Sequence, residues 1–154
     1  MTYRHRGILC SGNADLILRK ILKMSWDTFL KNNYEKMMQL GIDLRNLDSV
    51  RLSAGEMFRH QLVKFIICHH LTELRHHFKT EQLIRNAICD IIDLDTLRIY
   101  EVETRFAPSV AKKKLEDFYH PLIEDVFIVD LKKLKHWANI FDLRKEVARL
   151  CGLR

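Results

Sequence analysis

Hydrophobic residues recur at helical spacing in the N-terminal part of the chain. Between Asp15 and Leu40 the apolar positions follow one another at intervals typical of one face of an α-helix. They are Leu18, Ile21, Leu22, Trp26, Phe29, Leu30, Met37 and Met38. Ser25 is a candidate break between two helices, and Gly41 stands where a helix end favours glycine. The pattern therefore predicts a helical segment that stops near residue 40.

A second helical pattern follows the loop at residues 42–52. The stretch SAGE has the spacing of a capping box, in which Ser53 caps the helix and Glu56 reaches back to the first turn. We therefore predict a helix from about Ala54 to His76. Within it, Glu56, His60 and Lys64 recur at every fourth residue, so they form a polar stripe on one side of an otherwise apolar helix.

The period of the hydrophobic pattern changes at Phe78. Three short runs rich in apolar and β-branched residues follow, separated by RNA and by the turn-like DLDT, and they predict three consecutive strands in a meander. These runs are FKTEQLI, ICDIIDL and LRIYEVET. Residues 109–119 return to helical character, DVFIVDL at 125–131 predicts a further strand, and 139–152 predict a closing helix. A strand that returns beside a meander after a helix implies a mixed sheet, hence an α/β fold.

Composition narrows the class of protein. A chain of 154 residues suits one compact domain that folds without disulfides or a structural metal. The 26 basic and 20 acidic residues give a net charge of +6, which favours a polyanionic partner such as nucleic acid. The four scattered cysteines form no CxxC pair, and no apolar run reaches the roughly 18 residues of a membrane span. The N-terminus also lacks the apolar segment of a signal peptide. We expect a cytoplasmic protein with no membrane partner and no small-molecule cofactor.

The stretch IYEVETR places two glutamates side by side. On a strand, Glu101 and Glu103 point to the same face, where like charges repel unless a cation lies nearby. Asp90 lies on the neighbouring strand of the meander, and one register brings it within about 5 Å of the glutamates. Asp93 is the alternative, but it opens the DLDT turn, where aspartate is ordinary turn chemistry. Three converging carboxylates predict a site for Mg²⁺ or Mn²⁺.

The order of elements and the D…ExE pattern resemble the PD-(D/E)XK nuclease superfamily over about residues 53–135. Asp90 matches the family's metal-binding aspartate, Glu101 the acidic residue of (D/E)XK, and Glu103 its lysine. Glu56 falls where many members have a helix glutamate. Two features depart from the pattern, because Cys89 precedes Asp90 where the family has proline and because Glu103 replaces the lysine. Some restriction enzymes of the superfamily are similar in carrying a glutamate there.

The resemblance implies a restriction-endonuclease-like core at residues 53–154, with a mixed sheet flanked by helices and an N-terminal helical extension at 1–52. We expect a single compact domain overall. The N-terminal helices are candidates for forming a homodimer, for clamping DNA, or for both.

Roles for the site residues follow from the chemistry of phosphodiester hydrolysis. A divalent ion held by Asp90 and Glu101, with the Val102 carbonyl and Glu56 as further ligands, would lower the pKa of bound water and offset charge on the phosphate. Glu103 is a candidate for orienting that water, for acting as a base, or for holding a second ion. Lys114 is the expected catalytic cation, since a polar residue shortly before a helical tyrosine faces the site in similar proteins.

The expected nucleic-acid-binding residues lie around this site. They are Lys112, Lys113, Arg105, His60 and Lys64. The structural alternatives are a solvated face for the lysines of residues 112–114 and an ordinary helix position for His60. The histidines at positions 69, 70, 76 and 77 suggest zinc, but they lack matching cysteines and instead fit the polar end of a helix.

The leading hypothesis is a Mg²⁺- or Mn²⁺-dependent deoxyribonuclease. The alternative is a catalytically inactive protein of nuclease fold that binds DNA or serves in an assembly, which the missing motif lysine permits. A third hypothesis, a helical interaction module, would explain the N-terminal helices but not the convergent acids.

Overall fold

A computed structural model of the chain describes residues 32–52, 54–134 and 137–153. The chain divides into two compact units, residues 1–35 and 36–154. The predicted helices between residues 15 and 31 and the predicted cap Ser53 therefore lie outside the described residues. Residues 32–39 are helical and Gly41 follows with a φ of +69°, as the predicted helix stop requires. The predicted boundary at residue 52 stays a prediction.

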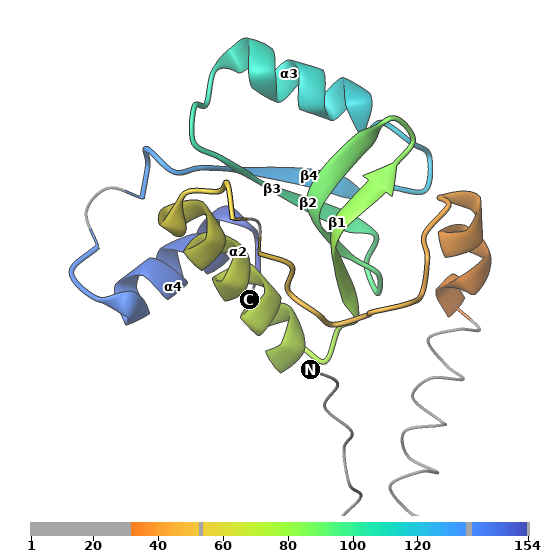
Figure 1. Ribbon diagram of the computed structural model, residues 1–154, viewed down its shortest axis with the longest axis horizontal. Coiled ribbons are helices and arrows are strands. Elements are labelled where there is room, and N and C mark those ends of the chain that lie inside the picture. Colours follow the sequence, from red (N-terminus) through yellow and green to blue (C-terminus); the bar gives the residue numbers. More distant parts are fainter. Residues whose placement is uncertain (1–31, 53, 135–136, 154) are drawn as a thin grey trace, which may run out of the picture. The chain divides into compact units, whose positions relative to one another are not determined.

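The second unit contains a four-stranded mixed sheet, which confirms the predicted α/β fold. The strand order is β1-β2-β3-β4, with β1 to β3 in an antiparallel meander and β4 parallel to β3. The elements are α2 (Phe58–Glu73), β1 (Phe78–Ile84), β2 (Ala87–Asp93), β3 (Arg98–Glu103), α3 (Pro108–Asp117), β4 (Asp125–Asp130) and α4 (Ile140–Leu150). Figure 1 shows α2 and α4 together on one face of the sheet and α3 on the other. None of the described helices is long and apolar enough to cross a membrane.

The main hydrophobic core lies between the sheet and the pair α2 and α4. Its fully buried members include Ile67 and Leu71 of α2, Ile91 of β2, Val129 of β4 and Val147 of α4. Strands β2 and β3 are buried on both faces over most of their length, which explains why their sequences read as nearly continuous apolar runs. This core fixes α2 over the strands that carry the acidic residues.

Helix α2 is shorter than predicted, and the predicted capping box is wrong. Met57 is the N-cap residue and makes no side-chain cap hydrogen bond, while residues 54–57 form a turn outside the helix. Gly55 lies in this turn and disfavours helix, and the helix begins after it at Phe58. The helix ends at Glu73, and Arg75 follows in the left-handed region with a φ of +59°.

The loop before α2 covers the free edge of β1. Asp48 accepts a hydrogen bond from the Phe78 N–H at 2.9 Å. The buried ammonium of Lys79 donates to the carbonyl oxygens of Asp43 and Arg45, the latter at 2.7 Å. The loop therefore satisfies an edge that would otherwise be open for pairing with another chain.

Candidate active site

The site begins where strands β2 and β3 separate. Their backbone pairing runs only as far as Ile91 and Tyr100. Beyond that pair the Asp90 N–H donates to Oε1 of Glu101 at 2.9 Å, and the Val102 N–H donates to Oδ2 of Asp90 at 2.8 Å. Two carboxylates thus replace backbone carbonyls as acceptors and fill the split between the strands. The structure brings Asp90 and Glu101 together, as the predicted register required.

Lys114 of α3 is the cation that faces the two glutamates. Its ammonium contacts Oε2 of Glu101 and lies 2.7 Å from Oε1 of Glu103. The Glu101 side chain is only 1 % exposed. Burial raises the pKa of Glu101 to about 7, and the charge of Asp90 adds to this effect while Lys114 opposes it. Burial opposes the charged form of Lys114, but Glu101 and Glu103 outweigh it and raise the Lys114 pKa.

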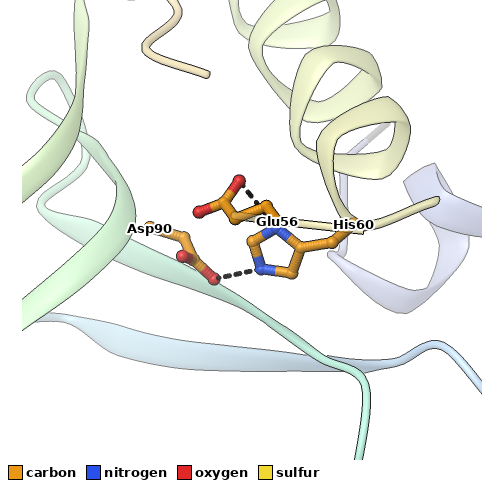
Figure 2. Close-up of side chains that lie close together, drawn as sticks. All are labelled: Glu56, His60 and Asp90. Atoms are coloured by element: carbon orange, nitrogen blue, oxygen red, sulfur yellow. Dashed lines mark hydrogen bonds and ion pairs between the residues drawn. The ribbon is translucent and has the colours of Figure 1, made fainter. Parts of the chain in front are cut away.

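A second group of side chains approaches Asp90 from α2. One ligand atom from each of Glu56, His60 and Asp90 lies within 4.8 Å of the others (Figure 2). His60 bridges the two acids, with Nδ1 at 3.2 Å from Oε2 of Glu56 and Nε2 at 3.3 Å from Oδ2 of Asp90. Glu56 comes from the turn before α2, and His60 lies in the first turn of the helix. Residues distant in sequence therefore converge at the strand split.

The two carboxylates of this group favour a positive charge on His60, so a metal ion bound here would displace a proton from the imidazole. The hydrogen bond to Asp90 raises the pKa of His60, and Glu56 adds to that rise although burial opposes it. Burial alone would raise the pKa of Asp90, but the hydrogen bonds from His60 and the Val102 N–H lower it overall. Two carboxylates and an imidazole form a donor set that fits a divalent transition metal.

The group opens onto a cleft of about 370 Å³. Several of the predicted site residues line this one cleft, which is large enough for a phosphate group and water. Its lining residues are Gly55, Glu56, Met57, His60, Asp90, Val102, Glu103, Thr104 and Lys114. Of the predicted metal ligands, Glu56 and Asp90 belong to the group with metal-ligand spacing, and Val102 lines the cleft. Glu101 lies outside that group, and its buried carboxylate contacts Lys114 instead.

Asp93, the alternative to Asp90, has a structural role. Its carboxylate accepts hydrogen bonds from the Asp95 N–H at 2.9 Å and the Thr96 hydroxyl at 2.6 Å. His76 lies against the same carboxylate at 2.8 Å. The DLDT turn thus uses Asp93 as an internal acceptor, whereas Asp90 faces the cleft.

The histidines at positions 69, 70, 76 and 77 form no metal-ligand group among the described residues. His76 and His77 contact Asp93 and Asp48, each at 2.8 Å. Within the described ranges, one group of three side chains has metal-ligand spacing, and it contains none of the histidines at positions 69, 70, 76 and 77. These histidines accordingly stay the polar end of α2 and its loop.

The predicted nucleic-acid residues divide into exposed and buried ones. Arg105, Lys112 and Lys113 are exposed, and Lys112 lies 3.9 Å from Glu116 one helical turn away. The assignment of Lys64 to nucleic acid is wrong, because its side chain is fully buried. The physical reason is that the polar stripe of α2 faces the sheet, so Lys64 lies inside the protein.

Sequence reasoning missed two exposed lysines near the cleft, Lys132 and Lys133, which we call the basic edge. Strands β3 and β4 are parallel, and Glu103 pairs with Asp130, so the loops that follow the two strands start at the same end of the sheet. Exposed Lys132 and Lys133 come from the loop after β4, and the Lys133 ammonium lies 5.9 Å from the ring centre of Phe106. The signal available in the sequence was a pair of lysines directly after a parallel strand.

No family model, curated protein or solved structure matches the chain. The likeness to PD-(D/E)XK nucleases thus stays a resemblance of motif and element order.

Proposed function

We propose that this protein is a divalent-metal-dependent nuclease that hydrolyses phosphodiester bonds in DNA. The observation that supports it best is the split between β2 and β3, where Asp90 and Glu101 converge with Glu56 and His60 on one side and Lys114 on the other. Lys114 faces two glutamates at once, and the carboxylates of Glu56, Asp90 and Glu103 line the cleft beside it.

Each residue has a role in this proposal. Asp90, Glu56 and His60 would hold the ion, which would lower the pKa of bound water and offset negative charge on the phosphate. Glu103 lines the cleft and is placed to accept a proton from the attacking water. Lys114 orients Glu103 and presents a positive charge toward the phosphate. An ammonium from α3 would thereby serve where the family places a lysine on the strand.

The donor set also favours Mn²⁺ over Mg²⁺. Mg²⁺ prefers oxygen ligands and near-ideal octahedral geometry, whereas an imidazole nitrogen suits transition metals. His60 is held between two carboxylates, so its ring is already oriented for such a role.

Purified protein should cleave plasmid, linear or branched DNA with Mn²⁺, more slowly with Mg²⁺, and not with EDTA. The same Mn²⁺ concentration should raise the midpoint of thermal unfolding, because ligands that bind only the folded state stabilise it. Cleavage that persists in EDTA, or the absence of both cleavage and Mn²⁺ stabilisation, would contradict the proposal.

One observation favours a second candidate function. Glu103 stands in place of the motif lysine and is already paired with Lys114, as expected for a DNA-binding protein of nuclease fold that has lost catalysis. Such a protein would bind DNA without cleaving it and would gain no stability from Mn²⁺, so the experiment above separates the two functions.

The basic edge should determine how DNA affinity depends on salt. A plot of log affinity against log salt concentration has a negative slope. Replacing Lys132 and Lys133 by glutamine should make this slope less steep by about two, because each phosphate contact releases roughly one counterion. Fluorescence anisotropy with labelled DNA and Ca²⁺ measures this slope. Lys145→Gln/Arg149→Gln is the matched control, since it also removes two positive charges and both side chains are exposed on α4. An equal loss of slope in the control would show that the effect is a general one of net charge.

A further inference from the structure

Lys64 is a fully buried cation beside the candidate metal site. Its ammonium contacts Oε1 of Glu81 and lies 3.9 Å from Oε1 of Glu56. Its neighbours in the sequence, Val63 and Phe65, are apolar, and Val63 is buried in the core. Taking an ammonium out of water costs several kcal/mol before pairing, and apolar residues of similar volume often replace buried ion pairs without loss of stability. Stability alone therefore does not explain a lysine at this position.

Glu81, the partner of Lys64, has an unusual backbone conformation. It lies within β1 with a φ of +53°, in the left-handed region that costs a non-glycine residue about 1–2 kcal/mol. In the β1–β2 register Glu81 lies across from Asp90, at a point where the ladder is interrupted although the residues on either side are paired. Strain of this kind persists only where surrounding contacts hold it, and it is concentrated at functional sites.

The contacts of Lys64 lead directly to the proposed ligands. Lys64 lies against one carboxylate oxygen of Glu56, and the other oxygen of Glu56 faces Nδ1 of His60 at 3.2 Å. Nε2 of His60 in turn faces Asp90 at 3.3 Å. The chain of contacts therefore runs from Glu81 through Lys64 to all three residues of the metal-ligand group.

We propose that Lys64 and Glu81 are positioning residues that preorganise the metal site. Their ion pair orients the carboxylate of Glu56 on the side away from His60 and maintains the interruption of the β1–β2 pairing next to Asp90. The three ligands therefore already lie close together in the metal-free protein. This inference rests on the proposed function, because it assigns the pair to a site for a divalent cation. Partners behind metal ligands typically affect metal affinity by about 10- to 100-fold.

The test uses the double variant Lys64→Met/Glu81→Gln. Removing Lys64 alone would also strengthen the negative field at the site, whereas the double variant removes one positive and one negative charge and keeps the net charge. Isothermal titration of the folded, EDTA-treated full chain with Mn²⁺ should show about 10- to 100-fold weaker binding than in the wild type. Lys79→Met is the control for loss of a buried ammonium, because Lys79 is also buried but donates to the carbonyl oxygens of Asp43 and Arg45 in the loop before α2. Its Mn²⁺ affinity should equal that of the wild type.

The outcomes separate this inference from the proposed function. If the wild type binds no Mn²⁺, the proposed function fails and the inference fails with it. If the wild type binds Mn²⁺ and the folded double variant binds equally well, only the inference is overturned. Should the double variant not fold, Lys64→Met alone is measured, since its partner Glu81 is 30 % exposed and can be solvated. Loss of this positive charge would by itself strengthen Mn²⁺ binding, so weaker binding supports the inference, and unchanged or tighter binding overturns it.

Discussion

Asp90→Asn should abolish measurable Mn²⁺ binding and lower metal-dependent cleavage by about a thousandfold, while the fold stays intact. The amide oxygen can still accept the hydrogen bond that the Val102 N–H now donates to Asp90. It carries no charge, however, so the ligand group loses one of its two carboxylates. Titration calorimetry with Mn²⁺ and initial rates of DNA cleavage measure the two effects.

Asp93→Asn is the matched control for this result. It lies on the same strand, but its carboxylate accepts hydrogen bonds within the turn that joins β2 to β3. We expect it to lower the free energy of unfolding by about 1–2 kcal/mol, because these bonds weaken when the acceptor loses its charge. Its Mn²⁺ affinity should not change. If Asp90→Asn instead destabilises the protein and still cleaves DNA, then Asp90 is structural and the proposed site is wrong.

Lys114→Met should destabilise the metal-free protein by about 2 kcal/mol and lower cleavage by about a hundredfold. Without the ammonium, the buried carboxylate of Glu101 keeps its backbone hydrogen bond but loses its cation. The Lys114 side chain is 26 % exposed, so solvent screening keeps the loss below that of a fully buried pair. Cleavage falls because Glu103 loses the contact that orients it. Chemical denaturation in EDTA and cleavage rates in Mn²⁺ give the two values.

Two further variants show whether the effect of Lys114→Met comes from the loss of its charge. Lys145→Met removes an exposed lysine on α4 and should leave both stability and cleavage close to the wild type. Adding Glu101→Gln to Lys114→Met should restore most of the lost stability, since no unpaired charge stays buried, but should not restore cleavage. If the added substitution restores neither, the loss reflects packing of the lysine side chain and not its charge.

The sequence predicted the sheet well because its hydrophobic runs are short and bounded by clear turn residues. Strand β1 matches its predicted range, and β2 to β4 differ by one residue at their ends. Helix α2 was predicted four residues too early, since the capping pattern at 53–56 is a local signal that the turn containing Gly55 overrides. Periodicity thus located the elements, while the start of a helix depended on how the chain enters it.

The site was predictable where strand register sets the distance and unpredictable where helix packing does. Asp90 and Glu101 are joined by a hairpin register, so their meeting follows from sequence spacing. The approach of His60 to Asp90 depends on how α2 packs against the sheet, which no local pattern contains. For the same reason the pattern assigns His60 and Lys64 of the polar stripe to nucleic acid, whereas Lys64 lies in the interior.

The hydrogen bonds at the strand split have a consequence for how this protein's descendants could change. Asp90 and Glu101 are acceptors for backbone N–H groups, so the sheet itself depends on them. Selection for folding alone would retain a hydrogen-bond acceptor, an acid or its amide, at both positions after catalysis had been lost. Glu56 and His60 accept no such backbone hydrogen bond among the contacts of the split, and relaxed selection would let them vary first. In related sequences, Glu56 and His60 would therefore distinguish active enzymes from inactive homologues better than Asp90 and Glu101 would.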